Sequence, residues 1–170
     1  MIRSAGMVGL LAGLAVGLTA CTATVNGSPS PAPGPPTTST RDALGSLDAC
    51  AVLDQLLAGQ GFQPGERKTV RNECVASKSE YGALALAIDP VQGLAELQAQ
   101  GPGAASLQIN GRQALRTGSA ANGMCEVALA VGEHARALVV ASITRSEVRA
   151  QVCTAAQELA TKLEPLLPRG

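Results

Sequence analysis

Residues 124–143 read MCEVALAVGEHARALVVASI, and this stretch decides the fold of the chain. Two apolar runs of strand length, residues 124–131 and 136–143, flank the four residues Gly132 to Ala135, which can form a turn. The stretch therefore predicts a hairpin of two strands. Residues 136–143 are apolar on both faces, as are residues 81–88, so we expect helices to cover both sides of the sheet.

Further strands and three helices are predicted on the N-terminal and C-terminal sides of this hairpin. The other strands are expected over residues 70–77, 81–88, 106–109 and 112–117, the last two joined by the hairpin turn Asn110-Gly111. The helices are expected over residues 47–58 with Ser46 as cap, from Asp89-Pro90 onward, and from the capping box Thr144–Glu147 to Pro168. This order predicts an α+β domain with a mostly antiparallel sheet of about five to six strands, flanked by N-terminal, middle and C-terminal helices.

The first twenty residues have the features of an export signal. A short segment containing Arg3 precedes the apolar run 7–18, which is as long as a signal-peptide core and shorter than the ~20 residues of a membrane-spanning helix. The run ends in Leu18-Thr19-Ala20-Cys21, which resembles the lipobox of bacterial lipoproteins. We expect cleavage before Cys21 and acylation of Cys21 (diacylglycerol, palmitate), anchoring the chain at the extracytoplasmic face of the cell membrane. The alternative is an ordinary secretory leader with an incidental cysteine.

The residues after Cys21 have the composition of a tether. Residues 22–40 (TATVNGSPSPAPGPPTTST) carry no charge and are rich in Pro, Ser and Thr, so they cannot bury enough apolar surface to order themselves. We therefore divide the chain into a signal peptide (1–20), the lipidated cysteine with a disordered tether (21–41) and a single domain (42–170).

Four cysteines remain in the domain: Cys50, Cys74, Cys125 and Cys153. An even number of cysteines in an exported chain predicts disulfides, and four cysteines allow three connectivities. We prefer Cys50–Cys74 and Cys125–Cys153, because each pair ties a predicted helix to a strand nearby in sequence. A redox or metal role is the alternative, but the sequence has no Cys-x-x-Cys motif and a single histidine, His134.

Composition and motifs point away from nucleic acids and from catalysis. Aromatic residues make up 1% of the chain and the formal net charge is 0, which fits neither base stacking nor phosphate binding. No Gly-x-Ser-x-Gly motif presents a nucleophile, and His134 is expected to be a solvated turn residue beside Glu133. Glu73 and Glu126 could act as a glycosidase pair only at about 5–10 Å from each other. We expect no catalytic residue, cofactor or metal. The charged cluster Glu66-Arg67-Lys68 with Arg71 is expected to be a solvated loop, and a contact patch for an anionic wall polymer is the alternative.

Alternating alanines on one predicted strand offer the one candidate for a ligand site. Ala83, Ala85 and Ala87 lie on the same face of residues 81–88. Small side chains on a sheet allow a helix to pack closely, which is the simpler interpretation. If no helix covers them, they leave room for an apolar ligand such as a lipid.

The sequence resembles an actinobacterial family of secreted four-cysteine lipoproteins, domain of unknown function 3558. The resemblance covers roughly residues 42–165 and rests on the following features: the lipobox, the Ser/Pro tether, Asp48-Ala-Cys-Ala-Val-Leu53, Cys74, Cys125, Cys153 and the turn Asn110–Ala114. The family is distantly similar to extracytoplasmic sensor domains of mycobacterial Ser/Thr kinases, which implies pairing of the first cysteine with the second and the third with the fourth. Val75-Ala76 stands where the family is expected to carry a tryptophan. The resemblance implies no activity and no catalytic residues.

Two classes of function follow from these observations. The first is a non-catalytic envelope lipoprotein that binds an apolar ligand, a wall polymer or an envelope protein. The second is a structural or assembly accessory of an envelope complex without a small ligand. A wall- or lipid-acting enzyme is the outsider, because the sequence supplies no activated nucleophile, metal shell or cofactor loop.

Overall fold

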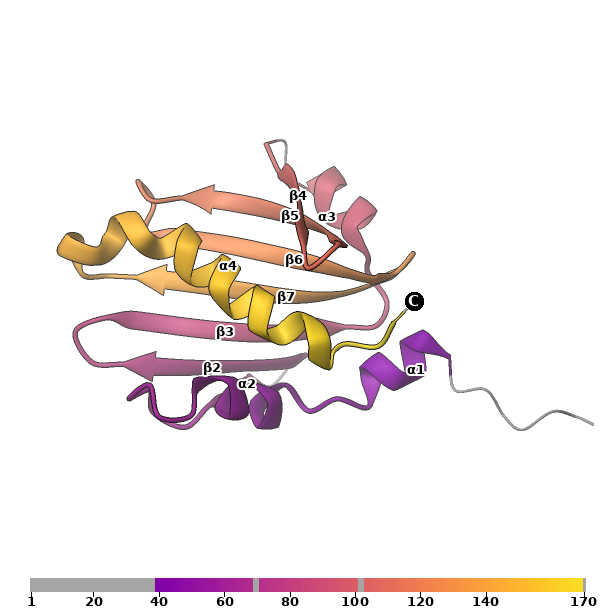
Figure 1. Cartoon of the computed structure of the whole chain (residues 1–170), viewed down its shortest axis with the longest axis horizontal. Coiled ribbons are helices and arrows are strands. Elements are labelled where there is room, and N and C mark those ends of the chain that lie inside the picture. Colours follow the sequence, from indigo (N-terminus) through magenta and orange to yellow (C-terminus); the bar gives the residue numbers. More distant parts are fainter. Residues whose placement is uncertain (1–38, 69–70, 101–102, 170) are drawn as a thin grey trace, which may run out of the picture. The chain divides into compact units, whose positions relative to one another are not determined.

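Seven strands form one antiparallel sheet in the computed structural model, which describes residues 39–68, 71–100 and 103–169 (Figure 1). The strands are β1 (Glu66–Lys68), β2 (Asn72–Lys78), β3 (Gly82–Asp89), β4 (Ala105–Ile109), β5 (Arg112–Ser119), β6 (Met124–Gly132) and β7 (Ala135–Ile143). They lie in the order β1-β2-β3-β7-β6-β5-β4. The predicted α+β class is confirmed, and the sheet has seven strands in place of the expected five to six.

The hairpin of β6 and β7 lies at the centre of the sheet. Val127 lies opposite Val139 and Leu129 opposite Ala137, and the register shifts between Ala130 and Gly132 next to the turn. These four side chains are fully buried on one face, which we call the inner face. The inner face also carries Leu84, Leu86 and Ile88 of β3, as their alternation predicts.

Two helices cover the inner face. Helix α2 (Ala49–Leu57) packs on β2 and β3, and α4 (Val152–Leu163) crosses β6 and β7, as its yellow ribbon shows in Figure 1. Short helical segments complete the domain: α1 (Thr40–Gly45), α3 (Leu94–Gln100), and the 3₁₀ turns η1 (Ser146–Gln151) and η2 (Glu164–Leu166). The core between sheet and helices is aliphatic, and its largest fully buried side chains are Leu44, Leu53, Leu86, Leu129, Ile143 and Leu163.

Two of the predicted helix caps are corrected by the structure. Asp48, not Ser46, caps α2: its Oδ1 accepts hydrogen bonds from the N–H groups of Cys50 and Ala51, two donors that a helix start leaves unpaired. Ser46 instead ends α1. The capping box Thr144–Glu147 does not form either, since Glu147 pairs with Arg145 and the chain makes the 3₁₀ turn η1 before α4 begins.

The predicted turns give a mixed outcome. Asn110 and Gly111 join β4 and β5 with φ of 49° and 85°, as predicted for a two-residue hairpin loop. Residues Glu66–Lys68, expected to be a loop, form the short edge strand β1. The helix expected from Asp89-Pro90 begins only at Leu94: Asp89 does accept the N–H groups of Val91 and Gln92, but this makes a turn at the end of β3.

Both preferred disulfides are present. Cys50 of α2 is bonded to Cys74 of β2, and Cys125 of β6 to Cys153 of α4, each with Cα atoms 5.0 Å apart. Cys74 and Cys125 point into the core and are fully buried. Each bridge therefore fixes one covering helix to the sheet.

Candidate functional site

The face of the sheet opposite α2 and α4, which we call the outer face, is the candidate site. Its middle consists of small and apolar side chains from three adjacent strands: Val75 of β2, Ala83, Ala85 and Ala87 of β3, and Leu138 and Val140 of β7. Among these six residues Ala85 is buried, at 8% exposed, and the other five are partly exposed. The three alanines predicted as a ligand surface thus do lie together on a partly open face.

Helix α3 covers only one end of the outer face. It packs on β5 and β6, where Leu115 and Ala128 are buried outside the main core cluster. The expectation that helices cover both sides of the sheet is therefore corrected for the part of the chain that the structure describes. Seven residues of α3, none of them buried, are too short to shield the alanines of β3.

A buried arginine fixes the segment before α3 to the outer face. Arg136 of β7 is 4% exposed; its Nη1 donates to the carbonyl of Gly93 at 2.9 Å and its Nη2 to Oε1 of Gln92 at 3.1 Å. The carboxylate of Asp89 lies 3.7 Å from Nη2 and supplies the opposite charge. The sequence analysis missed this residue, although a single charge within the apolar run 135–143 is a visible signal of a specific buried partner.

His134 contributes a second contact that holds α3. Its Nδ1 lies 2.6 Å from Oε1 of Glu96, and the other carboxylate oxygen of Glu96 accepts the N–H of Gly93 at 2.8 Å. The hydrogen bond from His134 is the main cause that lowers the pKa of Glu96. His134 is in the predicted turn and remains largely exposed, but it is a partner of α3 and not only a solvated residue.

The structure does not bring Glu73 and Glu126 together. They lie on β2 and β6, with β3 and β7 between them, so three strand spacings, about 14 Å, separate their strands. Glu126 accepts a hydrogen bond from Thr117 at 2.9 Å. This carboxylate pair is too widely spaced for either glycosidase geometry.

Cavities lie beside the outer-face alanines and not over them. A groove of about 430 Å³ runs between α3 and the β4–β5 hairpin, lined by Leu94, Gln98, Ser106, Leu107, Gln108, Gln113, Ala114 and Leu115. A smaller cavity of about 70 Å³ lies on the other side of the sheet, between Phe62, Tyr81 and α4. Burial, with a smaller effect of Glu158, raises the pKa of Tyr81. Both spaces are too open or too small to enclose a ligand.

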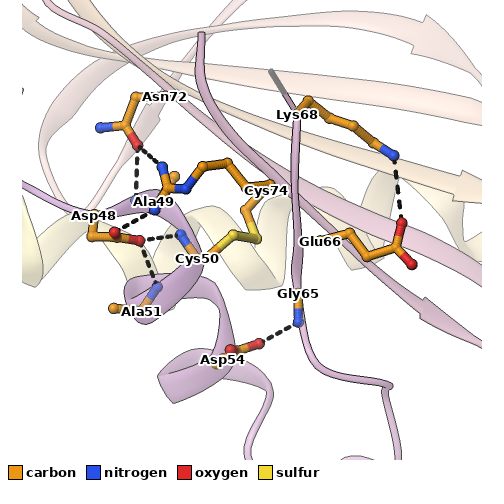
Figure 2. The surroundings of a disulfide bond; sticks show 11 residues. Asp48, Ala49, Cys50, Ala51, Asp54, Gly65, Glu66, Lys68, Asn72 and Cys74 are labelled. Carbon is orange, nitrogen blue, oxygen red and sulfur yellow. Dashed lines mark hydrogen bonds and ion pairs between the residues drawn. A yellow bond between two sulfur atoms is a disulfide. The ribbon is translucent and has the colours of Figure 1, made fainter. Parts of the chain in front are cut away.

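The side chains around the Cys50–Cys74 bridge are polar, and their hydrogen bonds hold the backbone in place (Figure 2). Asn72 accepts the N–H of Ala49 and donates to the carbonyl of Leu47, and Asp54 accepts the N–H of Gly65. Hydrogen bonds from the backbone of Ala51 and from the Arg67 side chain lower the pKa of Asp48. The charges of Glu66 and Lys68 pair with each other at 3.7 Å. These contacts position α2 against β1 and β2.

The predicted leader and lipid anchor lie outside the described residues. Cys21, the leader and most of the tether belong to residues 1–38, which the structure does not describe. Within the described ranges, no three His, Cys, Asp or Glu side chains gather as metal ligands. None of the described helices is long and apolar enough to cross a membrane.

Comparison with known proteins does not add a relative. No family model, curated protein or solved structure matches the chain. The functional argument therefore depends on the residues of the chain itself.

Proposed function

We propose that the chain is a non-catalytic binding domain of the bacterial cell envelope, anchored to the membrane through acylated Cys21. The lipobox-like residues 18–21 support the anchor. The two disulfides support an extracytoplasmic location, because such bridges persist in oxidising compartments. The tether 22–40, which at ~3.1 Å per residue reaches up to about 60 Å, would hold the domain away from the membrane surface.

The partly exposed apolar middle of the outer face is the observation that carries the binding role. A two-layer domain gains stability from its one covered face, so the apolar side chains of Val75, Leu138 and Val140 on the open face contribute little to the core. Exposed apolar patches of this kind mark contact surfaces. The described cavities lie beside this part of the face and not over it, so a small molecule bound there would remain largely in contact with water. We therefore favour a protein or wall polymer over a lipid.

The anchor is tested by labelling the full chain with a clickable palmitate analogue in an actinobacterial host. We expect label in the wild-type chain and in the Thr19→Ala variant, which keeps a small residue in the lipobox, and none in Cys21→Ser. Fractionation should place the labelled chains in the membrane. Equal labelling of Cys21→Ser would contradict the anchor.

The binding face is tested by photo-crosslinking in the same cells. A photoreactive residue at position 140 on the outer face should give a discrete adduct, while one at Glu158 on α4 serves as the control on the opposite side of the domain. Native mass spectrometry of the purified chain separates the two kinds of occupant, since a bound lipid adds a mass that disappears on denaturation. Absence of adducts at position 140, or equal adducts at both positions, would contradict the proposal.

A further inference from the structure

Strand β4 leaves one edge of the sheet unpaired in the part of the chain that the structure describes. The sheet ends in β1 on one side and β4 on the other. All three residues of β1 (Glu66, Arg67 and Lys68) are charged and exposed, a common protection of an edge against pairing with another strand. The five residues of β4, ASLQI, include no charge and no proline. The β4 edge therefore lacks the protection that the β1 edge has.

The hairpin register shows which backbone groups β4 offers. A two-residue loop is closed by a hydrogen-bonded pair, here Ile109 with Arg112, so the backbone groups of Ile109, Leu107 and Ala105 face β5. The N–H and C=O groups of Ser106 and Gln108 then point away from the sheet. Within the described ranges, no residue forms a hydrogen bond with these four groups. They are a ready template for one further antiparallel strand.

We propose that this further strand is β4 of a second copy of the chain, which makes one continuous sheet across two molecules. An antiparallel two-fold pair centred on Leu107 places Ser106 of one copy opposite Gln108 of the other, and both pairs exchange two backbone hydrogen bonds. Leu107, which is partly exposed beside the core, then faces its own counterpart in the closely spaced, non-hydrogen-bonded position. Neither strand brings a charge that would repel the other.

Neighbouring elements leave room for this pairing. The turn end of β4 is held to α4, because the Asn110 side chain donates to the carbonyl of Thr161 at 3.1 Å. Helix α3 packs on β5 and β6 from the outer face, where its Leu94 and Gln98 share a groove with β4. Within the described ranges, no group of α3 forms a hydrogen bond with the free backbone groups of β4. Two five-residue strands make a contact far below the roughly 1,600 Å² of a standard interface, so a shared membrane surface is needed to concentrate the copies. In that respect the inference rests on the proposed anchor.

A cysteine at position 107 gives the sharpest test. In the full chain in membranes, Leu107→Cys should form a disulfide-linked homodimer under mild oxidation, because residues in a non-hydrogen-bonded antiparallel pair have Cα atoms about 4.5 Å apart. Ser106→Cys is the matched control, since its two copies would be about 8 Å apart, beyond disulfide reach. Ser119→Cys, exposed at the far end of β5, reports random collision. We expect crosslinking of Leu107→Cys at least tenfold faster than that of either control.

Charge provides the second arm of the experiment. Adding Ser106→Lys and Gln108→Lys to the Leu107→Cys chain sets lysines opposite lysines and should slow crosslinking at least tenfold, while Gln113→Lys, on the neighbouring strand, should leave it nearly unchanged. All substituted side chains except Leu107 are exposed, and thermal unfolding checks that each variant keeps its fold. Equal crosslinking at positions 106, 107 and 119 would overturn the inference, as would mixed disulfides of Leu107→Cys with other proteins in place of a homodimer. Repeating the reaction on detergent-solubilised chains at raised concentration distinguishes failure of the β4 pairing from failure of the lipid anchor. A chain that crosslinks in detergent but is not labelled by palmitate refutes the anchor alone.

Discussion

Removal of the Cys50–Cys74 bridge tests how the fold is stabilised. The bridge closes a loop with a sequence separation of 24, and the Cys125–Cys153 bridge one of 28. On the chain-entropy estimate, loops of this length contribute about 3.5 kcal/mol each at 25 °C. A domain of about 130 residues has an unfolding entropy near 0.27 kcal/mol/K, so the Cys50→Ala/Cys74→Ala variant should lose about 13 °C in Tm.

The assay is thermal unfolding of residues 22–170, followed by far-UV circular dichroism with and without reductant. The two loops do not overlap, so loss of both bridges should cost about 7 kcal/mol, a large part of the stability of a domain of this size. Reduction of the wild-type chain breaks both bridges without removing atoms, which separates the crosslink from the small cavity that alanine leaves at buried Cys74. A double variant that unfolds within 3 °C of the oxidised wild type would refute the reasoning, as would peptide mapping that links Cys50 to Cys125 or Cys153.

Three further predictions concern single residues. Gly65→Ala should destabilise the domain by about 1–3 kcal/mol in urea unfolding, because the added Cβ would clash with the Cys74 sulfur. Gln63→Ala serves as the control, since Gly59 has a positive φ and Gly59→Ala would itself strain the backbone. Arg136→Met should cost about 3 kcal/mol and speed proteolysis within residues 90–100, because it removes the donors that hold Gly93 and Gln92 and leaves Asp89 without its partner. The pKa of Glu96 is lowered in the folded chain, so its contribution to folding stability is present above its ordinary pKa of 4.5 and is lost as the pH falls below that value. Glu96→Gln should therefore show a smaller drop in Tm than the wild type between about pH 5 and pH 3. An unchanged acid limb in Glu96→Gln would show that the His134 contact does not form in solution.

Local pattern was sufficient to predict most strands and both bridges. Side chains alternate between the two faces of a strand, so Leu84, Leu86 and Ile88 lie on one face whichever element covers it. Asn110-Gly111 forms a tight turn because both residues adopt positive φ, which is a local steric preference. The cysteine pairs follow because each joins elements that are neighbours in sequence and in space. These features depend on few long-range contacts.

The features that sequence reasoning missed depend on distant partners. Strand β1 is charged throughout and has no strand pattern; it forms because Arg67 reaches Asp48 and the backbone pairs with β2. The buried position of Arg136 depends on carbonyl and amide groups that lie 43 and 44 residues away. The uncovered outer face could not be predicted either, because apolar strands look the same in sequence whether a helix or a partner covers them.

The two faces of the sheet therefore serve different ends. Both disulfides, both covering helices and the main aliphatic core cluster belong to the inner face, so most of the stability of the domain depends on that side. On the outer face, the described contacts with the sheet are made mainly by the short helix α3 and by Arg136, which binds the segment before α3. An apolar surface that the fold does not need for its own stability exposes the chain to aggregation unless something covers it. The β1 edge carries three charged residues, whereas β4 carries none, which is the pattern expected where an edge contacts another molecule. On the outer face, Glu73 and Glu126 lie opposite Ala87 and Val140, so charged residues border the apolar middle of that face.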